Sequence, residues 1–237
     1  AKAVSILTDS DEYVAGWFSR GNAGFGGVLL LHGVRADRRQ MLDRARFLHQ
    51  EGYSVLLVDL PAHGESSGER ITFGAHEGKA VQAALSFLRE QLGPQEKIGV
   101  IGVSLGAASL VLAKKIDQPL SAVVLESMYP TIMEAVANRL ELHAGSVARY
   151  FAPLLLWQLP LRLGVSSGEL EPIKVLASLH APLLIAAGDR DLHTTIAETR
   201  RLFEVASPPK DLWIVEGAAH VDLYGFSPEA YRSKICG

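Results

Sequence analysis

The chain has 237 residues, of which 48% are apolar and 21% are charged, and its formal net charge is −3. This balance is typical of a folded globular protein and excludes an intrinsically disordered or low-complexity chain. The sequence has no apolar run long enough to predict a membrane-spanning helix, and the absence of a basic stripe argues against a nucleic-acid partner.

Residues 1–27 predict a less regular lead-in, within which 13–18 is expected to form an antiparallel edge strand. After it, short apolar runs alternate with longer amphipathic stretches. The runs predict strands at 28–31, 54–59, 97–103, 122–126, 182–188 and 212–216, and the stretches predict helices near 37–51, 73–92, 105–116, 194–206 and 228–235. The runs are apolar throughout, as in parallel strands buried on both faces. This pattern predicts an α/β fold with a mostly parallel central sheet and helices on both faces.

The alternation is interrupted at 127–178, which contains four prolines and the apolar run 150–157. So long a connection inside a compact domain usually has a function. We interpret it as a helical cap inserted over the carboxyl edge of the sheet, where α/β proteins bind ligands. The predicted α/β core then comprises 1–126 and 179–237, and core and cap form a single structural domain. Two alternatives stay open: a helical layer that seals the sheet, or peripheral contact with a membrane surface.

The strand that ends at Val103 runs directly into a predicted helix through the sequence Gly102-Val103-Ser104-Leu105-Gly106. A nucleophile on a sharp strand-to-helix turn needs small neighbours, which this sequence supplies. The turn would lift the hydroxyl of Ser104 clear of the sheet and point a helix N-terminus at an anion formed beside it. The alternative is a tight turn with a serine N-cap.

A serine hydroxyl needs a base at neutral pH, and three of the eight histidines are candidates. His220 follows the last predicted strand in a loop of small residues, which leaves its ring free to reach over the sheet edge. His32 follows the first long strand and is the rival candidate, whereas His63 lies in a turn and is interpreted as structural. The remaining ones, His49, His76, His143, His180 and His193, are interpreted as surface or capping residues. Their spacing predicts no metal site.

The base in turn needs a carboxylate that orients it. Asp191 lies three residues after Gly188, at a spacing that reaches back toward a late histidine. Asp189 and Glu126 are the other two candidates. Asp189 is expected to cap the turn or to pair with Arg190, and Glu126 ends the fourth predicted strand.

Four features occur in an order that resembles the α/β-hydrolase superfamily, over about residues 25 to 225. They are the Leu-His-Gly sequence at 31–33, the Asp-x-x-x-His-Gly-x-Ser-x-Gly segment at 59–68, the Gly-x-Ser-x-Gly turn at 102–106, and the Gly-Asp-Arg-Asp sequence at 188–191 followed by His220. The segment at 59–68 and the Glu-Ser-Met-Tyr-Pro sequence at 126–130 are similar to lysophospholipase-like and BEM46-type serine hydrolases.

The resemblance implies that Ser104 is the nucleophile, His220 the general base and then acid, and Asp191 its orienting partner. The oxyanion hole would use the backbone N–H groups of Val34 and Leu105. The triple-glycine oxyanion loop of lipases is absent, and His-Gly-Val-Arg stands at 32–35. That departure disfavours bulky tertiary-alcohol esters.

Apolar side chains of the cap are expected to line a pocket for an acyl or alcohol group. The expected pocket residues are His32, Met128, Tyr129, Phe151, Leu155 and Trp157, together with Tyr150, Leu154 and Leu156 of the same apolar run. Arg35, Arg38 and Arg39 either meet an anionic substrate group or are solvated. This pocket predicts a preference for medium-chain or otherwise apolar acyl groups.

The predicted function is hydrolysis of carboxylic esters or thioesters through an acyl-enzyme, with a small-molecule ester as substrate and no cofactor. Acyl transfer, amide or peptide hydrolysis and carbon–carbon hydrolysis use the same triad and stay open, as does a non-catalytic binding module with this fold. The absence of a glycine-rich dinucleotide motif argues against a nicotinamide or flavin enzyme. No secretory signal is seen, so a cytoplasmic location is expected, although the chain begins at Ala1 and a removed leader stays open. The sequence leaves the oligomeric state open.

Overall fold

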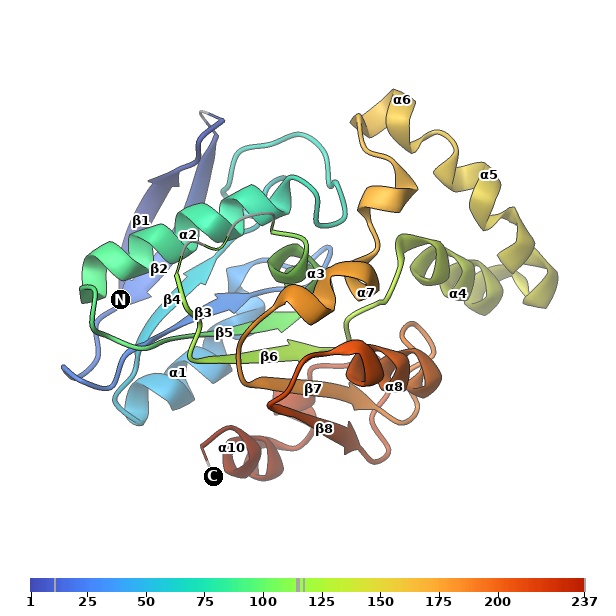
Figure 1. Cartoon of the computed structure of the whole chain (residues 1–237). Helices are drawn as coiled ribbons and strands as arrows, with labels where there is room; N and C mark the ends of the chain where they lie inside the picture. Colours follow the sequence, from blue (N-terminus) through green and yellow to red (C-terminus); the bar gives the residue numbers. More distant parts are fainter. Residues whose placement is uncertain (11, 114–115, 117, 237) are drawn as a thin grey trace.

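The computed structural model describes residues 1–10, 12–113, 116 and 118–236. Within them, eight strands form one sheet in the order β1-β2-β4-β3-β5-β6-β7-β8 (Figure 1). The strands are β1 (Lys2–Leu7), β2 (Tyr13–Ser19), β3 (Gly27–Leu31), β4 (Ser54–Val58), β5 (Ile98–Val103), β6 (Ala122–Glu126), β7 (Leu183–Gly188) and β8 (Lys210–Val215). Neighbours from β4 to β8 are parallel, and the pairs β1–β2 and β2–β4 are antiparallel. The predicted α/β fold with a mostly parallel sheet is confirmed.

The N-terminal part of the chain is more regular than its sequence predicted. The expectation that 13–18 forms the edge of the sheet was wrong, because β2 lies between β1 and β4, and β1 is the edge strand. The sequence pattern did not reveal β1, because Ser5 divides its apolar residues into the pairs Ala3-Val4 and Ile6-Leu7. Ile6 is its one buried residue, as an edge strand with a solvated face allows.

Helices cover both faces of the sheet, as predicted. They are α1 (Leu42–Gln50) with the preceding 3-10 turn η1 (Arg38–Met41), α2 (Glu77–Leu92), α3 (Leu105–Val111), α8 (Ile196–Val205), α9 (Leu223–Phe226) and α10 (Pro228–Cys236). Helix α3 is shorter than the predicted 105–116, and positions 114–115 of that prediction lie outside the described residues. Figure 1 shows α1 and α10 below the sheet and α2 and α3 above it.

Successive side chains of the parallel strands pack alternately into two separate apolar cores. In β3, Leu29 and Leu31 belong to the core shared with α2 and α3, whereas Val28 and Leu30 belong to the core shared with α1 and α10. This division follows from the two-residue period of a strand, which sends neighbouring side chains to opposite faces. It explains why the strands are apolar throughout.

The segment predicted as a cap, residues 127–178, folds into a chain of short helices. They are α4 (Ile132–Ala144), η2 (Ser146–Phe151), α5 (Ala152–Leu156), α6 (Leu159–Leu163), η3 (Ser167–Glu169), α7 (Pro172–Val175) and η4 (Leu176–Ser178). Proline occupies the first or second position of α5, α6 and α7. At these positions the helix does not use the missing N–H, and because proline disfavours a helical conformation of the residue before it, a preceding helix ends there. In Figure 1, α5 and α6 form an arm that stands away from the sheet. The boundaries of a separate cap remain a prediction.

Candidate active site

Ser104 forms the turn between β5 and α3 in a strained conformation. Its φ is 49° and its ψ is −104°, outside the regions that a residue with a Cβ normally adopts. The backbone holds it there, because the Ser104 N–H donates to the carbonyl of Glu126 at 2.8 Å and the Ala108 N–H donates to the carbonyl of Ser104 at 3.0 Å. Strain of this kind persists only where the surroundings impose it, and it is concentrated at functional sites.

Glycine is required at two close approaches that build the site. A Cβ on Gly106 would lie 2.6 Å from the carbonyl oxygen of Leu31, so only glycine lets α3 start against β3. A Cβ on Gly188 would lie 2.1 Å from the carbonyl oxygen of Ala218, so only glycine lets the loop after β8 pass the end of β7. That loop carries His220.

His220 and Asp191 meet at the carboxyl edge of the sheet. His220 Nδ1 lies 2.7 Å from Asp191 Oδ2, and Asp191 Oδ1 accepts the backbone N–H groups of His193 at 2.8 Å and Thr194 at 2.9 Å. Burial by itself would raise the pKa of Asp191, but these hydrogen bonds outweigh it and the pKa lies below its usual value. The carboxylate is therefore ionised at neutral pH, and Nδ1 of His220 carries the proton that it accepts. Among the described residues, Nε2 of His220 has no hydrogen-bond partner and is the ring nitrogen available to accept a proton.

Within the described residues, Ser104 Oγ has no hydrogen-bond partner and the Ser104 side chain is 4% exposed. Ser104 and the His220–Asp191 pair follow strands β5, β8 and β7, whose carboxyl ends share one edge of the sheet. Catalytic hydrogen bonds are often long or unformed without a substrate.

The other two carboxylate candidates have structural partners. Asp189 accepts the Gly217 N–H at 2.7 Å, so it ties the turn after β7 to the loop after β8. Glu126 is buried with Arg44, whose Nη2 lies 2.6 Å from its Oε2, and the two side chains are each 1% exposed. This pair ties α1 to β6 on the α1 side of the sheet, which leaves Glu126 unable to orient a histidine.

His32 does not line a pocket, contrary to our expectation. It is fully buried, its Nε2 accepts the Leu60 N–H at 2.9 Å, and its Nδ1 lies 2.7 Å from the carbonyl oxygen of Gly33. An imidazole that accepts at Nε2 must donate at Nδ1, so both ring nitrogens are used and His32 is neutral. Burial lowers its pKa to about 4. His63 is also structural, because its Nε2 accepts the Arg35 N–H at 3.2 Å.

The loop after β3 faces the nucleophile. A Cβ on Gly33 would lie 3.8 Å from Ser104 Cβ. The first N–H of a helix has no partner within the helix, so the Leu105 N–H is free to donate at this place. Among the described residues, neither it nor the Val34 N–H has a hydrogen-bond partner. Gln40, which the sequence did not single out, fixes the loop by accepting the Gly33 N–H at 2.8 Å.

A second histidine lies beside the pair, and the sequence did not predict it. The ring centroid of His193 is 4.9 Å from that of His220, and burial followed by the charge of His220 lowers the pKa of His193. Asn138 of α4 donates to the His193 carbonyl at 3.2 Å. Helix α4 therefore contacts the loop that carries Asp191. The two residues in contact are 55 positions apart in the sequence, so no local motif predicts it.

The expected pocket side chains divide into two groups. Met128, Tyr129 and Leu156 are buried in the core. Those of the apolar run are exposed instead of enclosing a pocket: Tyr150 by 78%, Phe151 by 57%, Leu154 by 65%, Leu155 by 42% and Trp157 by 72%. The expectation that they form a walled pocket was wrong in this structure, because α5 packs through the opposite side, at Ala152 and Leu156.

The three expected arginines differ in their surroundings. Arg38 is buried, with its Nη1 2.6 Å from Asp59, and is not free to meet a substrate anion. Arg39 pairs with Asp37 at 2.6 Å but is 73% exposed, and Arg35 is exposed. Among the described residues, no group of three His, Cys, Asp or Glu side chains could hold a metal ion, and no helix is long and apolar enough to cross a membrane.

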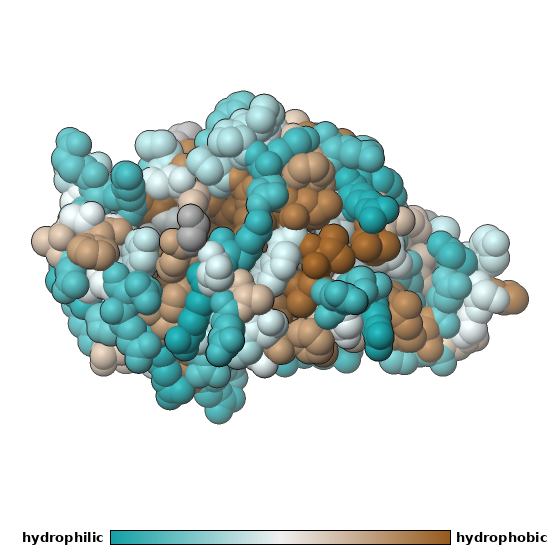
Figure 2. Space-filling view, turned by 90° about the horizontal axis from the view of Figure 1, so that it is seen from below, coloured by the Kyte–Doolittle hydropathy of each residue, from teal (hydrophilic) through white to brown (hydrophobic). Residues whose placement is uncertain are grey.

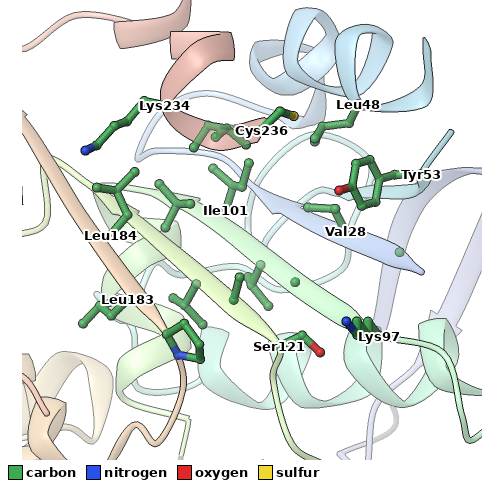
Figure 3. A pocket seen from close by; sticks show the side chains of 18 of the residues that line it. Val28, Leu48, Tyr53, Lys97, Ile101, Ser121, Leu183, Leu184, Lys234 and Cys236 are labelled. Carbon is green, nitrogen blue, oxygen red and sulfur yellow. The ribbon is translucent and has the colours of Figure 1, made fainter. Parts of the chain in front are cut away.

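A groove of about 1050 Å³ lies at the opposite end of the strands (Figure 3). Lys97, Ser121 and Leu183, at the starts of β5, β6 and β7, line it together with Leu48 of α1 and Cys236 of α10. Seen from below, apolar side chains gather near the middle of the molecule, with hydrophilic ones around them (Figure 2). The groove extends along the strands to Ile101 of β5 and Val124 of β6, but Ser104, Asp191 and His220 are not among the residues that line it. It is therefore not part of the candidate active site.

Comparisons with known proteins agree with this fold. A profile of the alpha/beta hydrolase family matches residues 28–233. An uncharacterized protein of Mycobacterium tuberculosis is 30% identical over 225 residues, which cover 92% of this chain and 72% of that protein. The uncharacterized protein YqkD of Bacillus subtilis is 24% identical, with 88% and 69% covered. An esterase of Pyrococcus furiosus has a similar structure, with a TM-score of 0.78 and 26% identity over 99% of this chain and 88% of that one. The subgroup named from the sequence remains a prediction.

Proposed function

The chain belongs to the alpha/beta hydrolase family, and from that premise we propose that it is a serine hydrolase that cleaves carboxylic esters or thioesters through an acyl-enzyme. One observation carries the proposal. Ser104 stands in a strained turn at the same sheet edge where His220 and Asp191 lie 2.7 Å apart. The esterase of Pyrococcus furiosus, which is similar over 99% of the chain, supports it.

In the first half-reaction, Ser104 Oγ bonds to the carbonyl carbon while His220 Nε2 takes the hydroxyl proton. The positive charge that forms on the ring faces the Asp191 carboxylate, which stabilises it. The N–H groups of Leu105 and Val34 donate to the oxyanion of the tetrahedral intermediate. Such donors, held in place before the reaction, are each worth about 3–4 kcal/mol.

The intermediate collapses when the bond to the leaving oxygen or sulfur breaks. His220 gives its proton to that atom, and the acyl group stays on Ser104. A water molecule then attacks the acyl-enzyme as His220 takes its proton, and collapse of the second intermediate releases the carboxylic acid and returns the proton to Ser104.

We expect apolar acyl groups of medium length to be preferred. The support for this is the run of exposed apolar side chains on η2 and α5, which directly follow α4, the helix whose Asn138 reaches the loop of Asp191.

The test is hydrolysis of p-nitrophenyl esters of increasing chain length by the wild type and Ser104→Ala. The variant should lose about a thousandfold or more in kcat/KM. Ser109→Ala is the matched control, since Ser109 is a buried serine of the same helix whose hydroxyl donates to the Leu105 carbonyl. Comparable hydrolysis by Ser104→Ala would refute the mechanism. A strict preference for acetyl esters would refute only the substrate preference.

A further inference from the structure

Six large apolar side chains of the segment η2–α6 point into solvent. They are Val147, Tyr150, Phe151, Leu154, Trp157 and Leu161, they are between 57% and 78% exposed, and we call them the cap face. Single exposed apolar residues are ordinary, but a contiguous apolar surface marks a place of interaction. Nothing in the described part of the chain covers it.

The fold itself does not need the cap face. The same segment packs onto the main core through Ala152, Leu156 and Leu159, which are 1%, 6% and 7% exposed. Two of its short helices each have a buried and an exposed apolar residue: in α5 Leu156 is buried and Leu154 is exposed, and in α6 Leu159 is buried and Leu161 is exposed. The segment is therefore apolar on two sides, and the second side requires a partner outside the fold.

The charge of the segment indicates the kind of partner. Between Gly145 and Gly164 there is no Asp or Glu, and the two charged residues are Arg149 and Arg162. Arg149 reaches Glu141 at 2.9 Å, with both side chains 40% or more exposed, and Arg162 is exposed. Exposed pairs of this kind hold weakly in water. The surface is thus apolar and basic, which fits a partner that is apolar and anionic.

A second copy of the chain fits this surface poorly. In either orientation of a two-fold pairing, the arginines of one copy approach those of the other without an acidic residue of the segment to compensate. Prolines 153 and 160 also break the segment into three short helices, which cannot form the straight seam of a helix pair.

We propose that the cap face lies in the interface of a lipid bilayer that contains anionic lipids. Segments of this composition bury an apolar face at the boundary of headgroups and acyl chains, and basic residues add attraction to anionic lipids. Trp157 and Tyr150 carry the amphipathic rings that prefer the headgroup level. Arg149 and Arg162 then contact lipid phosphates. On the basis of the proposed function, the substrates are acyl esters drawn from, or dissolved in, the membrane.

The experiment measures co-sedimentation of the full chain with vesicles of phosphatidylcholine, with or without about one third phosphatidylglycerol. We expect binding to the anionic vesicles, a blue shift of tryptophan emission, and weakening by salt. Val147→Asp with Leu161→Asp should weaken binding at least about tenfold, because it removes apolar area and adds charge that lipid phosphates repel. Arg149→Gln with Arg162→Gln should remove most of the difference between the two kinds of vesicle.

The matched control is Leu7→Asp with Val205→Asp, which changes the net charge equally at two exposed apolar residues outside the cap, 68% and 40% exposed. It should bind like the wild type. Three results overturn the proposal: no binding to anionic vesicles, equal weakening by both pairs of substitutions, or sedimentation of a wild-type dimer that Val147→Asp with Leu161→Asp converts to monomer.

Hydrolysis of a water-soluble ester in vesicle-free buffer tests the proposed function separately. If the wild type hydrolyses the ester but ignores vesicles, only the membrane proposal fails. If it binds vesicles through the cap face but Ser104→Ala hydrolyses as well as the wild type, only the proposed function fails.

Discussion

Lowering the pH from 7 to 5 tests whether His32 is held neutral inside the protein. The side chain is fully buried and its two nitrogens are engaged with Leu60 and Gly33. Burial is the largest cause that lowers its pKa from 6.5 to about 4, followed in the same direction by the charge of His63, while the Gly33 carbonyl and Asp59 act in the opposite direction. The unfolded chain therefore binds a proton at a pH where the folded chain does not.

The magnitude follows from linkage between proton binding and folding. Because the folded pKa lies below the unfolded one, stability is retained above pH 6.5 and is lost as the pH falls toward 4. With pKa values of about 4 and about 6.5, His32 alone removes about 2 kcal/mol between pH 7 and pH 5 and about 3 kcal/mol by pH 4.

The assay is urea unfolding of the wild type and His32→Gln at pH 7 and pH 5. The variant has no titrating group at this position, so all other pH effects are shared and the difference between the two slopes belongs to His32. We expect the wild type to lose about 2 kcal/mol more than the variant over this range. Titration of the His32 ring by NMR gives the pKa directly. Equal slopes, or a ring pKa near 6.5, would refute the reasoning.

Three further predictions concern the supports of the site. Arg44→Met leaves the buried Glu126 carboxylate without its ion-pair partner and should lower the free energy of unfolding in urea by about 3–5 kcal/mol. Arg44→Met with Glu126→Leu should recover most of that loss, and equal stability of the single and double variants would contradict this prediction. Gly106→Ala places a Cβ 2.6 Å from a β3 carbonyl oxygen and should cost about 1–3 kcal/mol and reduce ester hydrolysis, so a variant as stable as the wild type would disprove the tight contact. Asp191→Asn removes the carboxylate that keeps the proton of His220 on Nδ1 and should lower kcat on the order of 10³–10⁴-fold at neutral pH. Asp189→Asn should change kcat little, and a larger loss in Asp189→Asn than in Asp191→Asn would reassign the orienting carboxylate.

Several parts of the fold could be predicted because their signals are local. Strands such as β3 and β4 are buried on both faces, so their apolar runs are visible in the sequence. The turn at Ser104 needs small residues within two positions, and they are adjacent in the chain. In each case the residues that impose the structure are neighbours in sequence.

Other parts depended on contacts between distant residues. The roles of Asp189 and Glu126 were open in the sequence, and they were decided by Gly217 and Arg44, partners 28 and 82 residues away. His32 looked like a site residue because it follows a strand, and only the Leu60 N–H shows that its ring is used inside the protein. The apolar residues of edge strand β1 are interrupted by Ser5, so no unbroken apolar run marked it.

The sequence by itself determined that this chain forms a layered α/β domain with a serine at a strand-to-helix turn, because strand burial, helix starts and tight turns are written in residues close together. The tertiary structure decided between the histidines and carboxylates that the residue pattern had left open, and it showed that the apolar run of the cap faces solvent instead of a pocket. These outcomes depend on which side of each helix packs against the core and on partners far apart in the chain. Periodicity identifies that a helix has an apolar side, but when it has two, only packing decides which one is buried.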